Sequence, residues 1–251
     1  MNAEKIGAMR EGGEVLGRIL CELEAYVEVG MNELDIDKWV EAKILEYGAE
    51  VAYYEPAVNF PGAICISVND GFIHGVPEDN ILKDGDKVSF DLSIKYKGYY
   101  VDSAFTMVLG KGSGAVRQLI TTTKGALWAG IKKVKSGTKM GDVGAAVEEV
   151  LKNGKLGVVM NYVGHGIGKE IHEKPEVPNF GKRGEGYELK TGDTICIEPM
   201  ASLGKPENYV GEDGWTVIFK DGSVGAHFEH TVLVTDEGYE VLTLGENNEV
   251  K

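Results

Sequence analysis

The sequence predicts an α+β fold in which two related halves share one core, and three observations carry this prediction. First, the chain repeats itself once: GMNELDID at 30–37 aligns with GTKMGDVG at 137–144, and LKDGDKVSFD at 82–91 aligns with LKTGDTICIE at 189–198. Both alignments use one offset of 107 residues, and two copies this long are not a solenoid. Second, each half reads as helices followed by strands. Third, no low-complexity linker divides the chain. We therefore expect a single domain over 1–251, with repeats at about 3–110 and 114–245.

The predicted helices come in one pair per half. Long helices are expected at about 3–28 and 114–135, each followed by a second helix that keeps apolar residues at helical spacing. Asp35 and Asp142 precede these second helices and are the expected N-caps.

Three segments rich in β-branched and aromatic residues are the predicted strands. KVSFDLSIKY and YYVDSAFTMVL are joined by a turn at Gly98 and form a hairpin, and DTICIEPMASL is a strand of the second half. Proline and glycine cluster at 173–192, where we expect a loop.

Composition and charge narrow the class of protein. The chain has 251 residues, 43% of them hydrophobic and 26% charged, which is typical of a soluble globular protein. No apolar run is long enough to span a membrane, and the N-terminal stretch lacks the apolar core of a signal peptide. The net charge of −14 disfavours nucleic-acid binding, and three scattered cysteines argue against a disulfide framework. A cytoplasmic location is the default expectation.

Four acidic residues lie in apolar strand contexts and are candidates for binding cations. Asp91 and Asp102 stand on opposite arms of the hairpin, close to facing one another. Glu198 is the repeat equivalent of Asp91, so the pseudo-symmetry predicts that both approach one shared site. Glu229 lies in AHFEHTVLVT, where alternation puts His227 on the same side. Buried carboxylates of like charge need a shared proton, a basic partner or a metal ion. With an imidazole or two added, this oxygen-rich set suits a pair of first-row metal ions.

The segment VGHGIGKEIHEKP, residues 163–175, carries two of the five histidines. His165 and His172 are seven apart among glycines, which disfavour a helix, and an unbent strand would send them to opposite faces. We therefore expect an extended, bent segment in which the glycines permit the turn and keep bulk away from the ions.

Five segments together resemble the signature of type I methionine aminopeptidases: VNDGFIHGVP, FDLSIKYKGYYVDSAFT, NYVGHGIGKEIHEKP, TICIEPM and HFEHT, in this order. The similarity covers essentially the whole chain. The resemblance implies the pita-bread fold, whose halves are related by a pseudo-twofold axis. It also implies removal of the initiator methionine from nascent proteins and peptides, with a preference for a small second residue.

The resemblance implies a role for each candidate residue. Two divalent ions (manganese, iron, cobalt or zinc) would be held by five ligands: Asp91, Asp102, His165, Glu198 and Glu229. Asp102 and Glu229 would bridge both ions, Asp91 would bind one, and His165 with Glu198 the other. A metal-bound hydroxide would attack the scissile carbonyl with Glu198 as the proton shuttle. His74 and His172 would contact the substrate amide and act in catalysis.

The methionine pocket is implied in the same way, and two positions depart from the family. The residues resembling its lining are Phe60, Cys65, His74, Ile171, His172 and Trp215. Ile171 stands where phenylalanine is common, and His227 where glutamine is usual. The first would reshape the pocket, and the second adds an imidazole close to the metals. Cys196 is expected to be a buried small hydrophobe.

Two rival functions remain at this point. The first is an Xaa-Pro aminopeptidase or dipeptidase of the same fold, which generally carries an extra N-terminal domain, whereas this chain begins almost directly with the repeat. The second is a binding protein on the same fold, which would lose ligands that are present here. Type II methionine aminopeptidases would need an insertion that the 31 positions between Glu198 and Glu229 do not accommodate. The expected partners are nascent polypeptide N-termini; a monomer is the simpler expectation, and ribosome contact is left open.

Overall fold

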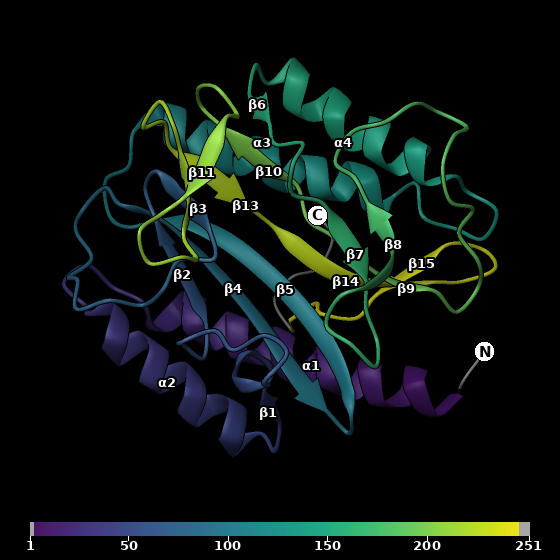
Figure 1. Ribbon diagram of the computed structural model, residues 1–251, viewed down its shortest axis with the longest axis horizontal. Coiled ribbons are helices and arrows are strands. Elements are labelled where there is room, and N and C mark those ends of the chain that lie inside the picture. Colours follow the sequence, from purple (N-terminus) through teal and green to yellow (C-terminus); the bar gives the residue numbers. More distant parts are fainter. Residues whose placement is uncertain (1–2, 246–251) are drawn as a thin grey trace.

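The computed structural model describes residues 3–245, and its elements follow the predicted order of helices and strands (Figure 1). The helices are α1 (Ala3–Tyr26), α2 (Glu33–Glu46), the 3-10 turn η1 (Ala52–Tyr54), α3 (Gly114–Ile131) and α4 (Met140–Asn153). The strands of the first half are β1 (Glu50–Val51), β2 (Cys65–Val68), β3 (Gly71–Ile73), β4 (Lys87–Tyr96) and β5 (Tyr99–Val108). Those of the second half are β6 (Gly157–Val158), β7 (Gly164–Gly166), β8 (Glu173–Val177), β9 (Thr194–Ile197), β10 (Met200–Ser202), β11 (Asn208–Val210), β12 (Val217–Phe219), β13 (Gly225–His227), β14 (Glu229–Val234) and β15 (Tyr239–Val241).

A nine-stranded antiparallel sheet joins the two halves. Its order is β1-β4-β5-β14-β9-β7-β8, with β15 beside β14 and β2 beside β4. The hairpin of β4 and β5 is the longest pairing and turns at Lys97 and Gly98, both of which have positive φ. The repeat-related strands β4 and β9 therefore flank the central pair β5–β14. Two three-stranded sheets, β13-β10-β6 and β11-β12-β3, complete the fold.

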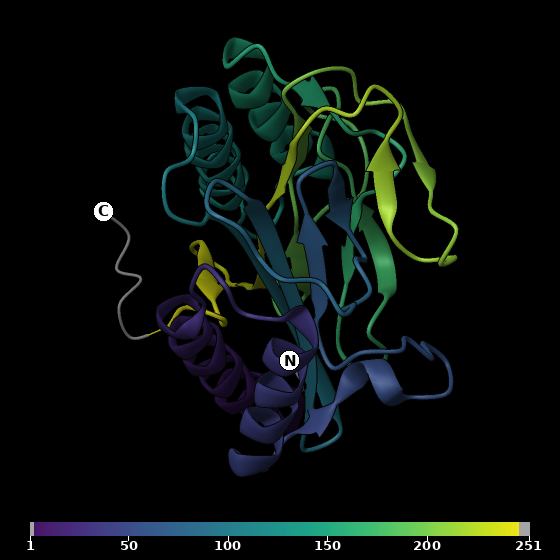
Figure 2. The same ribbon diagram turned by 90° about the vertical axis from the view of Figure 1, so that its left-hand side faces the viewer.

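The four α-helices cover one face of the large sheet, with α1 and α2 over the first half and α3 and α4 over the second (Figure 2). Their apolar stripes pack into two main core clusters. Ile36, Val40 and Ile44 of α2 are fully buried in the first, and Val143, Val147 and Leu151 of α4 are fully buried in the second. The opposite face of the sheet carries loops and short strands, and it is the face on which the candidate site lies.

The α+β class is confirmed, but several local predictions are wrong. Asn32, not Asp35, caps α2, because its side-chain oxygen accepts from the Leu34 backbone amide at 2.9 Å. Asp142 lies inside α4 and accepts from the Gly184 amide instead. DTICIEPMASL is two strands, β9 and β10, in different sheets, separated at Glu198 and Pro199. The segment 173–192 begins with strand β8.

Within residues 3–245, no helix has the length and apolar character needed to cross a membrane.

Candidate metal centre and substrate pocket

Three of the four candidate carboxylates surround Ala104 on one face of the sheet. Asp91 of β4 pairs with Ala104 of β5, and Ala104 pairs on its other side with Glu229 of β14. Directly paired residues point to the same face, so these side chains form a row across three strands. Asp102, two residues before Ala104, shares this face, so it lies diagonal to Asp91 rather than directly opposite it. One oxygen from each acid lies within 4.8 Å of the others, over an alanine too small to separate them.

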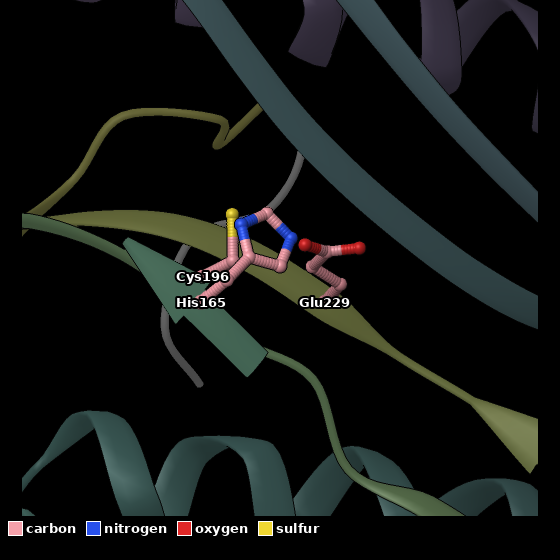
Figure 3. Close-up of side chains that lie close together, drawn as sticks. All are labelled: His165, Cys196 and Glu229. Atoms are coloured by element: carbon pink, nitrogen blue, oxygen red, sulfur yellow. The ribbon is translucent and has the colours of Figure 1, made fainter. Parts of the chain in front are cut away.

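The second half adds Glu198 and His165 to this cluster. Glu198 follows β9 at the strand break, and its Oε1 lies 3.6 Å from Nε2 of His165 on β7. Nδ1 of His165 donates to the Gly166 carbonyl at 3.0 Å, which leaves the Nε2 lone pair free to face the acids. In Figure 3 the Glu229 carboxylate lies beside the ring of His165, with the Cys196 sulfur at the other edge of that ring.

Cys196 is close to the cluster but is not set up as an anionic ligand. It is fully buried on β9 and lies 3.6 Å from the Thr231 hydroxyl. Burial, together with the nearby Glu229 and Asp102 carboxylates, raises the pKa of the Cys196 thiol well above its usual value. Because the thiolate is the form that binds metals, Cys196 acts as a small buried side chain here.

The bend around His165 comes from two strands joined by a short loop. β7 and β8 pair antiparallel with an irregularity at His165 and Gly166, and this folds His172 back beside His165, with ring centroids 4.4 Å apart. The prediction that the glycines permit the turn and keep bulk away from the ions is wrong for Gly164 and Gly166. A Cβ on Gly164 would lie 2.2 Å from the Cys196 carbonyl, and one on Gly166 would lie 2.3 Å from the Lys174 carbonyl. These glycines permit close backbone approach to β9 and β8.

The electrostatics of the cluster call for a cation. Burial and mutual repulsion raise the pKa values of Asp102 and Glu229 well above normal, burial and the Asp91 charge do the same for Glu198, and burial raises the pKa of Asp91. Oδ1 of Asp102 and Oε1 of Glu229 are buried with no hydrogen-bond partner among the described residues. Burial also lowers the pKa of His165 to about 3, so this imidazole is neutral at pH 7 and able to bind a metal. An oxygen-rich set with neutral imidazole fits divalent first-row ions.

An aromatic wall lies beside Asp91. Phe60 packs edge-on against Trp215, with ring centroids 5.3 Å apart, and against Tyr53 at 5.5 Å. Cys65 is buried directly opposite Asp91, and Ile171 packs against the same cluster. Tyr53 was missed from the sequence: its hydroxyl donates to Oδ1 of Asp91 at 2.8 Å, and nothing in EVAYYEP signals that long-range contact.

His74 and His172 lie near the acidic cluster on different segments of the chain. His74 follows β3 with φ of +55°, a left-handed conformation uncommon for residues other than glycine, and its ring lies 6.0 Å from that of Tyr162. Burial lowers the pKa of His74 to about 4 and also lowers the pKa of His172. Both rings are therefore neutral at pH 7.

The last histidine, His230, belongs to the other face of the sheet. Its Nδ1 lies 2.9 Å from the Thr243 hydroxyl and 3.2 Å from that of Ser103. It lines a cavity of about 650 Å³ between α1 and α3, and none of the predicted site residues lines that cavity. The predicted alternation, with His230 turned away from Glu229, matches this position.

The fold and the acidic cluster define a metallopeptidase: residues 7–236 match metallopeptidase family M24, and the chain belongs to that family. It is 41% identical to the methionine aminopeptidase of Mycoplasma capricolum over 243 residues, covering 96% of each chain. It superposes on the crystal structure of methionine aminopeptidase from Thermotoga maritima with a TM-score of 0.94 and 36% identity, covering 97% of this chain and 98% of that one. The pita-bread fold implied by the sequence is thereby confirmed. Prolidase from Pyrococcus furiosus shares the fold alone, with a TM-score of 0.77, 24% identity and coverage of 64% of that chain.

Proposed function

We propose that this protein removes the N-terminal methionine from nascent proteins and peptides as a metal-dependent aminopeptidase. The observation that carries the proposal is the row of Asp91, Ala104 and Glu229, with Asp102 beside it and Glu198 and His165 closing over it. Full-length similarity to methionine aminopeptidases supports methionine as the residue removed.

We assign five metal ligands to this site: Asp91, Asp102, His165, Glu198 and Glu229. These ligands would hold two divalent ions, manganese, iron, cobalt or zinc. Bound there, such ions supply Lewis-acid activation of water and of the scissile carbonyl. Asp102 and Glu229 each have a buried oxygen without a hydrogen-bond partner among the described residues, which supports their assignment as ligands, and both would be shared by the two ions.

Glu198 has the environment of a proton carrier. Its carboxylate follows β9 at the strand break, 3.6 Å from Nε2 of His165, and we assign it to accept a proton from the attacking water and pass it to the departing amine. The neutral imidazoles of His74 and His172 are assigned to the substrate amide, where a ring N–H stabilises the developing oxyanion.

The aromatic wall forms the proposed methionine pocket. Phe60, Trp215, Cys65 and Ile171 give an apolar surface next to Asp91, suited to an unbranched thioether side chain. A free α-amino group near the acids would explain action at an N-terminus. A small second residue, a cytoplasmic location and a monomeric state belong to the same proposal, as does a single catalytic domain built from the two repeats.

Hydrolysis of Met-Ala-Ser by the purified protein, reconstituted with manganese, iron, cobalt or zinc, tests the proposal. We expect release of free methionine with at least one of these metals and none after chelation. An Ala-Pro peptide serves as the control for Xaa-Pro activity. Absence of methionine release with all four metals, or faster cleavage of the Ala-Pro peptide, would overturn the proposal.

A further inference from the structure

His227, at the end of β13, is a buried imidazole without a hydrogen-bond partner for either ring nitrogen among the described residues. Only 1% of the residue is exposed. Buried polar groups are nearly always paired, and an exception calls for an explanation such as an ion. The two ring nitrogens therefore need a partner other than the side chains and backbone of residues 3–245, such as an ion.

The backbone of His227 is held in place from both sides. Its N–H donates to the Thr106 hydroxyl at 2.9 Å, and the same hydroxyl donates to the His227 carbonyl at 2.6 Å. Pairing with Met200 of β10 adds a second constraint. The ring is thus presented to the acidic cluster by a fixed strand end, as a preorganised ligand is.

The distances from Nε2 of His227 suit ligands of one cation better than hydrogen bonds. The atom lies 3.6 Å from Oε2 of Glu198 and 3.9 Å from Oε2 of Glu229. Both separations are too long for hydrogen bonds. Metal bonds of about 2.1 Å allow two donors of one ion to lie up to about 4.2 Å apart. One donor atom from each of the three residues lies within 4.8 Å of the others.

Glu198 separates two imidazoles that approach it in the same way. Nε2 of His165 lies 3.6 Å from Oε1, and Nε2 of His227 lies 3.6 Å from Oε2. A cation bound to either carboxylate oxygen of Glu198 would therefore have an imidazole nitrogen close by as a further ligand.

We infer that His227 is a sixth protein ligand of the metal centre, binding through Nε2 the ion that Glu198 and Glu229 hold. The inference rests on the metal centre of the proposed function but not on the peptide that the enzyme cleaves. A second imidazole shifts the donor set towards nitrogen, which favours iron, cobalt and zinc over manganese.

The experiment counts imidazoles on the metal. The wild-type protein and His227→Gln are loaded with Co(II), and the paramagnetically shifted ring N–H proton signals, assigned with ¹⁵N-histidine, are counted. We expect two such signals in the wild type and one in His227→Gln. His230→Gln is the matched control, since it removes an imidazole from the other face of the sheet, and it should keep two.

A second measurement compares metal affinities by chelator competition. His227→Gln should weaken Co(II) binding by about tenfold or more and Mn(II) binding by less, a loss of the size seen when groups supporting a metal site are removed. One shifted ring N–H in the wild type would overturn the inference, and this count stands even if the variant fails to fold. Equal counts and equal affinities in wild type and His227→Gln would overturn it too.

Hydrolysis of Met-Ala-Ser by the same cobalt sample separates the two proposals. Two shifted signals without hydrolysis would support the ligand and contradict the aminopeptidase. Hydrolysis with one shifted signal would support the aminopeptidase and contradict His227 as a ligand.

Discussion

Asp102 and Thr231 bind each other twice across the central strand pair. The Asp102 amide donates to the Thr231 hydroxyl at 2.9 Å, and that hydroxyl donates to the Asp102 carbonyl at 2.8 Å. Both residues are buried, and Thr231 is wholly so. The side chain thus replaces the backbone ladder where β5 and β14 diverge beside the acidic cluster.

Thr231→Val should destabilise the protein because it leaves the buried Asp102 amide unpaired. We expect the free energy of unfolding in urea to fall by about 1–3 kcal/mol. Thr231→Ser keeps the hydroxyl and is the matched control. Valine keeps the methyl group of threonine and replaces only the hydroxyl, so an unchanged free energy of unfolding in Thr231→Val would contradict a stabilising role for the paired bonds.

Glu198→Gln should abolish most peptide hydrolysis because the amide cannot carry the proton assigned to Glu198. We expect kcat for Met-Ala-Ser to fall by roughly 10²–10⁴-fold, the usual contribution of a general acid–base group. Glu237→Gln, in the exposed turn before β15, should behave as wild type. Metal content measured in parallel separates lost chemistry from lost ions, and wild-type kcat in Glu198→Gln would remove Glu198 from the mechanism.

Phe60→Leu should weaken methionine binding by removing the edge contacts with Trp215 and Tyr53 that shape the pocket wall. A loss of about 1 kcal/mol corresponds to a rise in KM of roughly fivefold. Phe90→Leu is the matched control, because Phe90 packs against Phe105 in the core with centroids 5.3 Å apart. A similar rise in KM in both variants would contradict a specific role for Phe60.

The buried amine of Lys87 should make the free energy of unfolding depend on pH. It is almost fully buried, and its Nζ donates to the carbonyls of Ser67 at 3.0 Å and Gly71 at 2.8 Å. Burial lowers the pKa of Lys87 to about 7, and the charge of Asp70 opposes this shift. The unfolded chain, with an ordinary pKa near 10.5, binds more protons between these values, so stability should rise with pH from about 7 to 10.5.

Comparison with Lys87→Met isolates this effect. Urea unfolding in the presence of chelator should show wild-type stability rising relative to the variant above pH 7, by at most about 1.4 kcal/mol per pH unit. A difference that stays constant from pH 7 to 9.5 would mean that Lys87 keeps an ordinary pKa in the folded protein.

The repeat and the alternation of strands predicted the architecture well, because both are periodic properties of the sequence. The hairpin of β4 and β5 and the helix pairs follow directly from them. The strand break at Glu198 had a signal that the prediction did not use, because Pro199 follows Glu198 and proline is rare inside a central strand. The N-cap of α2 was misplaced because Asn32 and Asp35 are both capping residues, and the contact with Leu34 decides between them.

For the candidate site, the sequence could name the acids and histidines but not their neighbours. Ala104, Tyr53 and Thr231 matter through contacts between residues far apart in the chain. The two unpaired ring nitrogens of His227 likewise become visible only once the surrounding side chains are placed.

The row through Ala104 crosses the boundary between the two repeats, with Asp91 and Asp102 on one side and His165, Glu198 and Glu229 on the other. Each half alone therefore carries an incomplete set of the proposed metal ligands. Filling the centre and docking the halves are linked equilibria, and each must strengthen the other by the same free energy. Metal ions bound there would thus stabilise the docking of the two halves as well as take part in catalysis.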